Sequence, residues 1–241
     1  MTKGEPRPDH IALLTRDTTL PLARIEDEHL DVILKAITAA WQDLQALGKP
    51  ALTQGSEPEV NAALIFQLNH RCQDESCWKG LVHSVQSGRE SISFNGAKLE
   101  KRPDLSLIFL HGNRNFPMVA ECKIVDHPNR KDIGLYCDKG IARFVCGDYA
   151  WTNREAIMLA YVRDGSTVPS KLTHHLARSA NAQPDPLLTA SMPGPREGFP
   201  ADVHFTTHGR PFQYLPCCDG TDPGEITLAH LWLGSVHKKT I

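Results

Sequence analysis

Two apolar segments joined by a short polar turn constrain the fold of this chain more than any other feature. They lie within residues 102–126, which read RPDLSLIFLHGNRNFPMVAECKIVD. The runs before and after HGNRN are typical of buried strands that fold back on each other as a hairpin. Alternate strand positions face the same way, so Asp104, Glu121 and Lys123 are expected on one side of the hairpin. The segment therefore predicts two central strands that present two acids and a lysine on a common face.

The expected pairing of the two strands brings these charges close together. A symmetric turn in the middle of HGNRN would place Ser106 opposite Glu121 and Asp104 opposite Lys123. Asp104 and Glu121 would then be diagonal neighbours, roughly 7–8 Å apart. Carboxylates at that separation repel each other unless a cation lies between them. Lys123 supplies one positive charge, and Mg²⁺, which prefers oxygen ligands, would supply more. The alternative to a metal site is that Lys123 and Asp104 form only an ordinary surface salt bridge.

The remainder of the sequence predicts an α/β fold with a central mixed β-sheet flanked by helices. Helices are expected at 24–47, from Ser56 onward, at 74–86, at 132–150 and at 169–179, from the helical spacing of apolar residues or from capping signals. Strand patterns are expected within 91–110 and at 155–162, 203–207 and 226–233. Residues 1–23 are predicted to be a loose leader with local order at most at HIALL, residues 10–14. Residues 24–241 are predicted to be a single domain, and 180–200 a long loop rich in proline, serine and glycine.

Composition narrows the class of protein. The 241 residues include 26 basic and 28 acidic ones, a formal net charge of −2, which excludes a uniformly basic nucleic-acid coat. No apolar run approaches the ~20 residues of a membrane span, and no signal peptide is recognisable. We therefore expect a cytoplasmic protein that does not enter a membrane. The seven cysteines are odd in number and irregularly spaced, as expected for free thiols in a reducing compartment.

The cysteines also suggest a zinc site as an alternative to a magnesium site. Its candidate ligands are His70, Cys72, Cys77 and the adjacent pair Cys217 and Cys218. Structural zinc sites usually take four ligands in paired short spacings. Adjacent cysteines rarely bind one ion together, so the sequence disfavours this interpretation.

The charged hairpin resembles the PD-(D/E)XK motif of the restriction-endonuclease-like nuclease superfamily. Pro103-Asp104 matches the PD element and Glu121-Cys122-Lys123 matches (D/E)XK. The resemblance covers about residues 57–163 and implies a restriction-endonuclease-like core that hydrolyses phosphodiesters with Mg²⁺ or Mn²⁺. It further implies that Asp104, Glu121 and the Cys122 carbonyl bind the metal and that Lys123 orients the attacking water. An acid on the helix before the sheet often joins this site, and Glu59 is the residue expected there.

The resemblance also suggests where nucleic acid would bind. Nine basic and six acidic residues lie between Lys98 and Arg143, which favours a locally positive rim. The candidate contacts are Arg102, Lys131, Tyr136, Lys139 and Arg143. His208 and His230 are further candidates to line the cleft. The expected partner is nucleic acid, with DNA favoured, and relatives often work as homodimers or within larger restriction, repair or phage-defence assemblies.

Three interpretations follow from the sequence. The first is a metal-dependent nuclease. The second is a catalytically silent module of nuclease fold that binds nucleic acid or a protein partner. The third is an ordinary α/β protein in which the motif is accidental. Dependence on a divalent metal separates the first interpretation from the other two.

Overall fold

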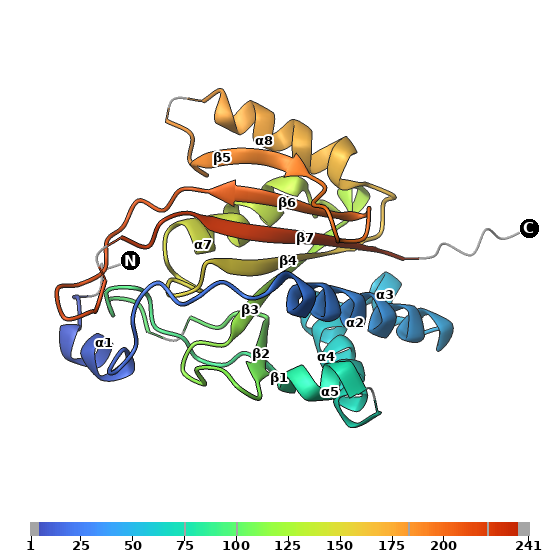
Figure 1. Cartoon of the computed structure of the whole chain (residues 1–241). Coiled ribbons are helices and arrows are strands. Elements are labelled where there is room, and N and C mark those ends of the chain that lie inside the picture. Colours follow the sequence, from blue (N-terminus) through green and yellow to red (C-terminus); the bar gives the residue numbers. More distant parts are fainter. Residues whose placement is uncertain (1–4, 75, 100, 183, 221, 236–241) are drawn as a thin grey trace, which may run out of the picture.

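The computed structural model contains a seven-stranded mixed sheet with helices on both faces (Figure 1). The structure describes residues 5–74, 76–99, 101–182, 184–220 and 222–235, without the side chains of residues 74–77. The strand order is β1-β2-β3-β4-β7-β6-β5. Strands β3, β4 and β7 are parallel at the centre, and the pairs on either side of them are antiparallel. The α/β class and the mixed sheet flanked by helices are thus as predicted.

The elements have the following bounds. The strands are β1 Val82–Ser87, β2 Leu105–Phe109, β3 Met118–Val125, β4 Glu155–Val162, β5 Thr189–Gly194, β6 Val203–His208 and β7 Ile226–Gly234. The α-helices are α1 Pro8–Leu14, α2 Asp27–Ala46, α3 Ala51–Gln54, α4 Glu57–Asp74, α5 Ser76–Leu81, α6 Ile133–Tyr136, α7 Ala142–Val145 and α8 Thr173–Ala180. A 3₁₀ turn, η1 His127–Asn129, and two π-helical turns, η2 Cys137–Ile141 and η3 Val168–Leu172, complete the chain.

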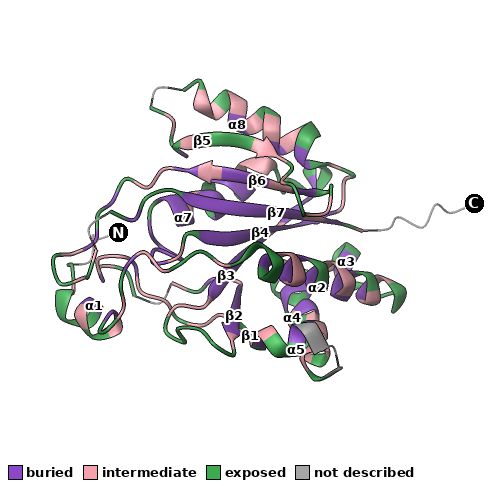
Figure 2. Ribbon diagram, viewed as in Figure 1, coloured by how far each residue is buried: buried purple, intermediate pink, exposed green. Residues whose placement is uncertain are grey.

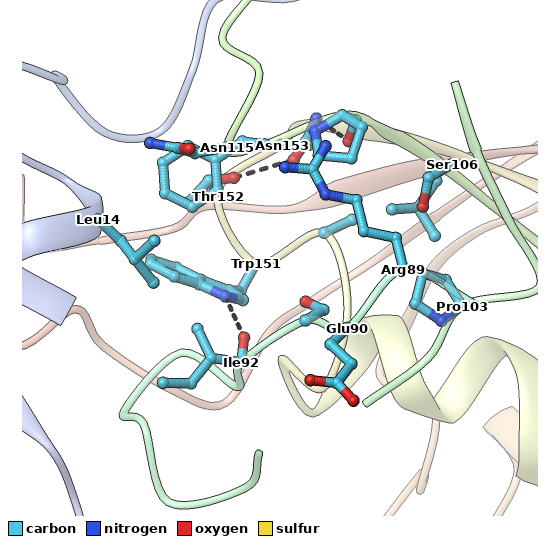
Figure 3. A pocket seen from close by; sticks show the side chains of 15 residues that line it. Leu14, Arg89, Glu90, Ile92, Pro103, Ser106, Asn115, Trp151, Thr152 and Asn153 are labelled. Atoms are coloured by element: carbon cyan, nitrogen blue, oxygen red, sulfur yellow. Dashed lines mark hydrogen bonds between the residues drawn. The ribbon is translucent and has the colours of Figure 1, made fainter. Parts of the chain in front are cut away.

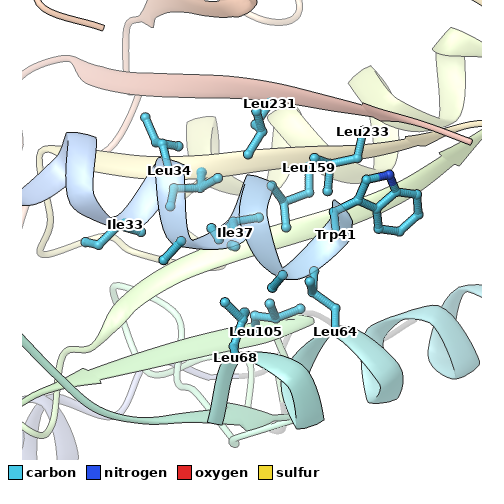
Figure 4. Packing of buried hydrophobic residues seen from close by; sticks show 14 of the residues in the cluster. Ile33, Leu34, Ile37, Trp41, Leu64, Leu68, Leu105, Leu159, Leu231 and Leu233 are labelled. Carbon is cyan, nitrogen blue, oxygen red and sulfur yellow. The ribbon is translucent and has the colours of Figure 1, made fainter. Parts of the chain in front are cut away.

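One face of the sheet is covered by α2 and α4. The apolar stripe of α2 buries Ile33, Leu34, Ile37 and Trp41 against the strands (Figure 4). Trp41 stacks on Tyr161 of β4, with ring centroids 5.4 Å apart. Helix α4 completes this core, and its first turn reaches the edge of β3. No helix in the described part of the chain is both long enough and apolar enough to cross a membrane.

The opposite face is covered by α8 and by the continuous segment α6–η2–α7. Figure 2 shows the central strands buried from both sides. Gly140, in the π-helical turn, lies against the sheet: a Cβ there would be 2.5 Å from the Met158 methyl carbon and 3.9 Å from Glu121 Cγ. The helix therefore approaches β3 and β4 closely at the level of Glu121, which only glycine permits without moving Met158.

Three expectations about local structure need correction. The segment 74–86 is not one helix, because it divides into α5 and the edge strand β1, whose polar residues obscure its two buried valines. The segment 180–200 contains a strand, β5, within the expected loop. This strand includes Pro193, which an edge position tolerates because it has no second neighbour to receive a hydrogen bond.

The third correction concerns residues 1–23, which are not loose where the structure describes them. Helix α1 buries Ile11, and Leu20 is also buried beside Trp151, Phe212 and Tyr214. Backbone hydrogen bonds from Leu20 to Asp219 and from residue 22 to residue 152 fix the segment to the domain. The N-terminal segment is therefore part of the packed structure.

Candidate active site at the free edge of β3

The charged residues gather where β3 extends beyond its neighbour. Strand β2 pairs with β3 only as far as Leu105 opposite Ala120, and no other described strand pairs with the following part of β3 on that side. Two carboxylates take the place of the missing strand. The Cys122 N–H donates to Asp104 Oδ2 at 2.8 Å, and the Ile124 N–H donates to Glu57 Oε2 at 3.3 Å. The exposed strand edge thus fixes two acids beside the backbone.

The observed register differs from the expected one by two residues. Ser106 lies opposite Val119 rather than opposite Glu121. A shift of two residues leaves every side chain on its original face, whereas a shift of one would have reversed them all. The predicted convergence of Asp104, Glu121 and Lys123 is consequently found even though the predicted pairing is wrong.

Lys123 is the centre of the cluster. Its Nζ lies 2.9 Å from Glu121 Oε1, 3.1 Å from Glu57 Oε1, 3.4 Å from Asp104 Oδ2 and 2.6 Å from the Cys122 carbonyl oxygen. Only 11% of the lysine side chain is exposed. Arg143 approaches the same Glu121 oxygen at 3.7 Å. Two cations therefore face three carboxylates in a partly water-excluded site, where electrostatic interactions are strong.

Burial and mutual repulsion set the protonation of the cluster. Burial raises the pKa of Glu121 to about 7, and the neighbouring Asp104 charge adds to this, against the opposing effect of Lys123. Burial lowers the pKa of Lys123, but the three carboxylates outweigh it and hold that pKa above its usual value, so the ammonium stays charged. Glu121 Oε2 is buried and has no hydrogen-bond partner among the described residues. A buried carboxylate oxygen without a partner is costly unless something else binds it.

A second group of residues holds the cluster in place. Asn61 donates to Asp104 Oδ1 at 3.0 Å, and the Tyr161 hydroxyl donates to Asn61 Oδ1 at 2.7 Å. Arg143 donates to the Tyr149 hydroxyl, which in turn donates to the Arg102 carbonyl at 2.9 Å. Asp104 and Arg143 are therefore both positioned by buried polar groups.

Glu59 does not join the cluster, contrary to the expectation. It is exposed, and its carboxylate accepts from the backbone N–H and the hydroxyl of Ser56, each at 2.7 Å. It therefore caps the start of α4. Glu57, two residues earlier on the same helix, contacts Lys123 instead. Sequence reasoning missed Glu57 because both acids lie in the first helical turn and only the docking of α4 distinguishes them.

Several residues predicted to contact nucleic acid lie elsewhere. Tyr136 is fully buried, and its hydroxyl lies 2.8 Å from His230 Nδ1. His230 and His208 are also fully buried, joined through the Thr206 hydroxyl at 2.7 and 2.8 Å. None of the three aromatic side chains is accessible to a ligand, so these predictions were wrong.

The remaining basic candidates are accessible. Arg143 is 34% exposed at the margin of the cluster. Arg102 is exposed and pairs with Glu90 at 2.5 Å. Lys131 and Lys139 are exposed. Their contact with nucleic acid stays a prediction.

The donor set is compatible with a hard divalent cation. Among the described residues, no three His, Cys, Asp or Glu side chains are arranged to hold a metal ion, and the Lys123 ammonium lies between the acids. Asp104, Glu121 and the Cys122 carbonyl nevertheless offer only oxygen atoms, and the partnerless Glu121 Oε2 is a free ligand atom. Mg²⁺ typically takes one or two protein carboxylates and keeps several waters. The residues present therefore fit such an ion, provided the lysine gives way.

The candidate zinc ligands come from different parts of the fold. His70 and Cys72 lie on α4, whereas the Cys217 thiol donates to the Pro8 carbonyl beside α1. The side chain of Cys77 lies outside the described residues.

Comparison with known proteins adds no relative. No protein-family model matches the chain, and no curated protein or solved structure gives a significant match.

Proposed function

We propose that this protein is a metal-dependent phosphodiesterase with a restriction-endonuclease-like core that acts on nucleic acid, with DNA as the favoured substrate. The supporting observation is the convergence of Asp104, Glu121 and Lys123 at the free edge of β3, with both acids within 3.4 Å of Lys123 Nζ. Charged groups of both signs held together in a partly buried site are costly, and such arrangements are concentrated at functional sites. The six free cysteines described are compatible with a cytoplasmic setting.

In this proposal the residues divide the chemistry of hydrolysis between them. Asp104, Glu121 and the Cys122 carbonyl would hold Mg²⁺ or Mn²⁺, which supplies Lewis-acid polarisation and a lowered pKa of bound water. Lys123 Nζ donates a hydrogen bond to the attacking water and, as charge develops, to a phosphate oxygen. Glu57, 3.1 Å from the lysine ammonium, would keep it beside the site once the metal displaces it from Asp104, Glu121 and the Cys122 carbonyl. Arg143 lies where its guanidinium can bind a second phosphate oxygen.

The same geometry supports a second candidate, a nuclease-fold module that binds nucleic acid or a protein partner without cutting it. The observation that favours it is the position of Lys123 Nζ among the acids, where a metal ion would otherwise lie. In this case the carboxylates would serve to satisfy the free edge of β3.

Incubation with plasmid, linear duplex, single-stranded DNA and RNA, with Mn²⁺ or with chelator, tests the proposal. We expect metal-dependent cleavage that Asp104→Asn and Lys123→Met each reduce by at least about a hundredfold. Glu59→Gln, an acid from the same helical turn as Glu57, is the matched control and should cut like the parent. Circular dichroism confirms that the variants fold. Cleavage that survives in both site variants refutes the site, and metal-independent binding without cleavage favours the second candidate.

A further inference from the structure

A pocket on the same face of the sheet lies next to the charged cluster. It has a volume of about 130 Å³, enough for several water molecules (Figure 3). The residues that bound it come from α1, from the segments before and after β2, from β2 itself, from the start of β3 and from the segment before β4; they include Leu14, Arg89, Ser106, Phe116, Val119 and Trp151.

Two polar groups in this pocket have no partner in the described structure. The Ser106 hydroxyl is fully buried and makes no hydrogen bond to any described residue. The Arg89 side chain reaches into the pocket toward Asn153 (Figure 3) and forms no ion pair with any described residue. Its acidic neighbour Glu90 pairs with Arg102, which lies outside the pocket lining, at 2.5 Å. Because the Ser106 hydroxyl is inaccessible, the unpaired Arg89 guanidinium is the group that calls for a ligand with hydrogen-bond acceptors.

The pocket and the cluster are adjacent through the chain. Ser106 follows Asp104 by two residues on the same face, and Val119 precedes Glu121 by two on the next strand. Two residues along a strand span roughly 7 Å. Pro103 lines the pocket and is bonded to Asp104. The pocket therefore lies about two strand residues from the proposed reaction centre. This spacing is comparable to that between a phosphate and the base of the same nucleotide.

We infer that this pocket binds the base of the nucleotide that flanks the scissile phosphate, and that it favours guanine. This inference rests on the proposed function. The walls are apolar and aromatic at Ile92, Phe116 and Trp151, which suits the faces of a heterocyclic ring rather than a hydrated phosphate. Arginine paired with O6 and N7 is the commonest specific contact to guanine, and Arg89 is the guanidinium that faces the pocket.

Binding and cleavage are measured separately to test this inference. Titration of the full chain with GMP, AMP, CMP and UMP at millimolar concentration in chelator, followed by NMR shifts or calorimetry, detects the pocket without any cleavage. We expect GMP to bind most tightly and Arg89→Met to weaken GMP binding by roughly tenfold or more. Arg130→Met, which removes an exposed arginine just after the η1 turn, is the matched control and should bind like the parent.

The outcomes distinguish failure of this inference from failure of the proposed function. Three results refute the proposed base-binding pocket, whatever the cleavage assay gives: all four nucleotides bind equally, none binds, or GMP affinity is unchanged in Arg89→Met. GMP binding that depends on Arg89, in a protein that cuts no substrate, supports the pocket and refutes the nuclease. If the parent cuts, its preference for sites next to guanine should disappear in Arg89→Met while cleavage itself persists.

Discussion

At the scale of single residues, the candidate site depends on which acid of the first turn of α4 faces the sheet. Glu57 contacts Lys123 and the backbone of Ile124, whereas Glu59 caps the helix through Ser56. We expect Glu57→Gln to lower metal-dependent cleavage about 10- to 100-fold, as removal of an outer partner of a metal site does. Glu59→Gln should be close to the parent, because glutamine also serves in a capping box. Cleavage rates of the two variants at saturating Mn²⁺ measure the difference, and equal rates would remove Glu57 from the site.

The buried histidines make a second residue-scale prediction, on stability rather than activity. His208 Nδ1 donates to the Leu187 carbonyl at 2.9 Å, so its Nε2 accepts from the Thr206 hydroxyl. The Thr206 oxygen then accepts from His230 Nε2, and His230 Nδ1 accepts from the Tyr136 hydroxyl. In this arrangement every donor meets an acceptor with both imidazoles neutral, whereas a charged His230 would have to donate to Tyr136, whose hydroxyl would then donate to the Met158 carbonyl at 3.3 Å.

Burial lowers the pKa of both histidines, and for His230 the nearby His208 and His204 add to the effect. The unfolded state therefore binds protons that the folded state excludes, so stability is full above about pH 6.5 and falls as pH drops below it. The loss is up to about 1.4 kcal/mol per histidine for each pH unit. Urea unfolding of the parent and of His208→Gln with His230→Gln, at about pH 8 and about pH 5, should show a smaller difference in the double variant. Parallel pH profiles would contradict neutral buried histidines.

At the scale of elements, Asp104 depends on a hydrogen-bonded path that starts on β4. The Tyr161 hydroxyl donates to Asn61 on α4, and Asn61 donates to Asp104. Tyr161→Phe leaves the Asn61 oxygen without its donor, which should cost about 1–3 kcal/mol of unfolding free energy, and it should also weaken cleavage. Tyr214→Phe is the matched control, because it removes another buried hydroxyl, which donates to the Trp151 carbonyl away from the cluster. We expect the two variants to lose comparable stability and only Tyr161→Phe to lose cleavage activity. Equal cleavage activities in the two variants would show that this hydrogen-bonded path does not position Asp104.

The elements that sequence patterns predict well are those with strong periodicity and full burial. Strand β4 is buried along its whole length, and α2 has a continuous apolar stripe, so both are recognisable from the order of residues. The edge strands β1 and β5 are not, because each buries few side chains and β5 contains a proline. Asp104, Glu121 and Lys123 share a face of the hairpin whenever the strand pairing is shifted by an even number of residues. That part of the site is therefore predicted correctly although the predicted pairing is wrong by two residues. Glu57 and the buried Tyr136 depend on how helices dock on the sheet, and local sequence carries little of that information.

At the scale of the whole molecule, the N-terminal segment closes one end of the sheet and forms a wall of the pocket. Leu14 of α1 lines the pocket beside Trp151, and Ile11 of the same helix is fully buried in the small core that includes Trp151, Phe212 and Tyr214. The sequence alone suggested a loose leader because seven helical residues contain too few apolar positions to establish a periodic pattern.

If the segment is integral to the domain, substitutions on its two faces should differ sharply. Ile11→Ala removes a fully buried side chain and should cost about 2–5 kcal/mol, with a lower unfolding midpoint in urea. Leu13→Ala, on the same helix but 64% exposed, should change stability by no more than about 0.5 kcal/mol. Because α1 also bounds the pocket, Ile11→Ala should weaken GMP binding under conditions in which the protein remains folded, while Leu13→Ala should not. Equal unfolding midpoints for the two variants would mean that the segment is peripheral and does not form a wall of the pocket in solution.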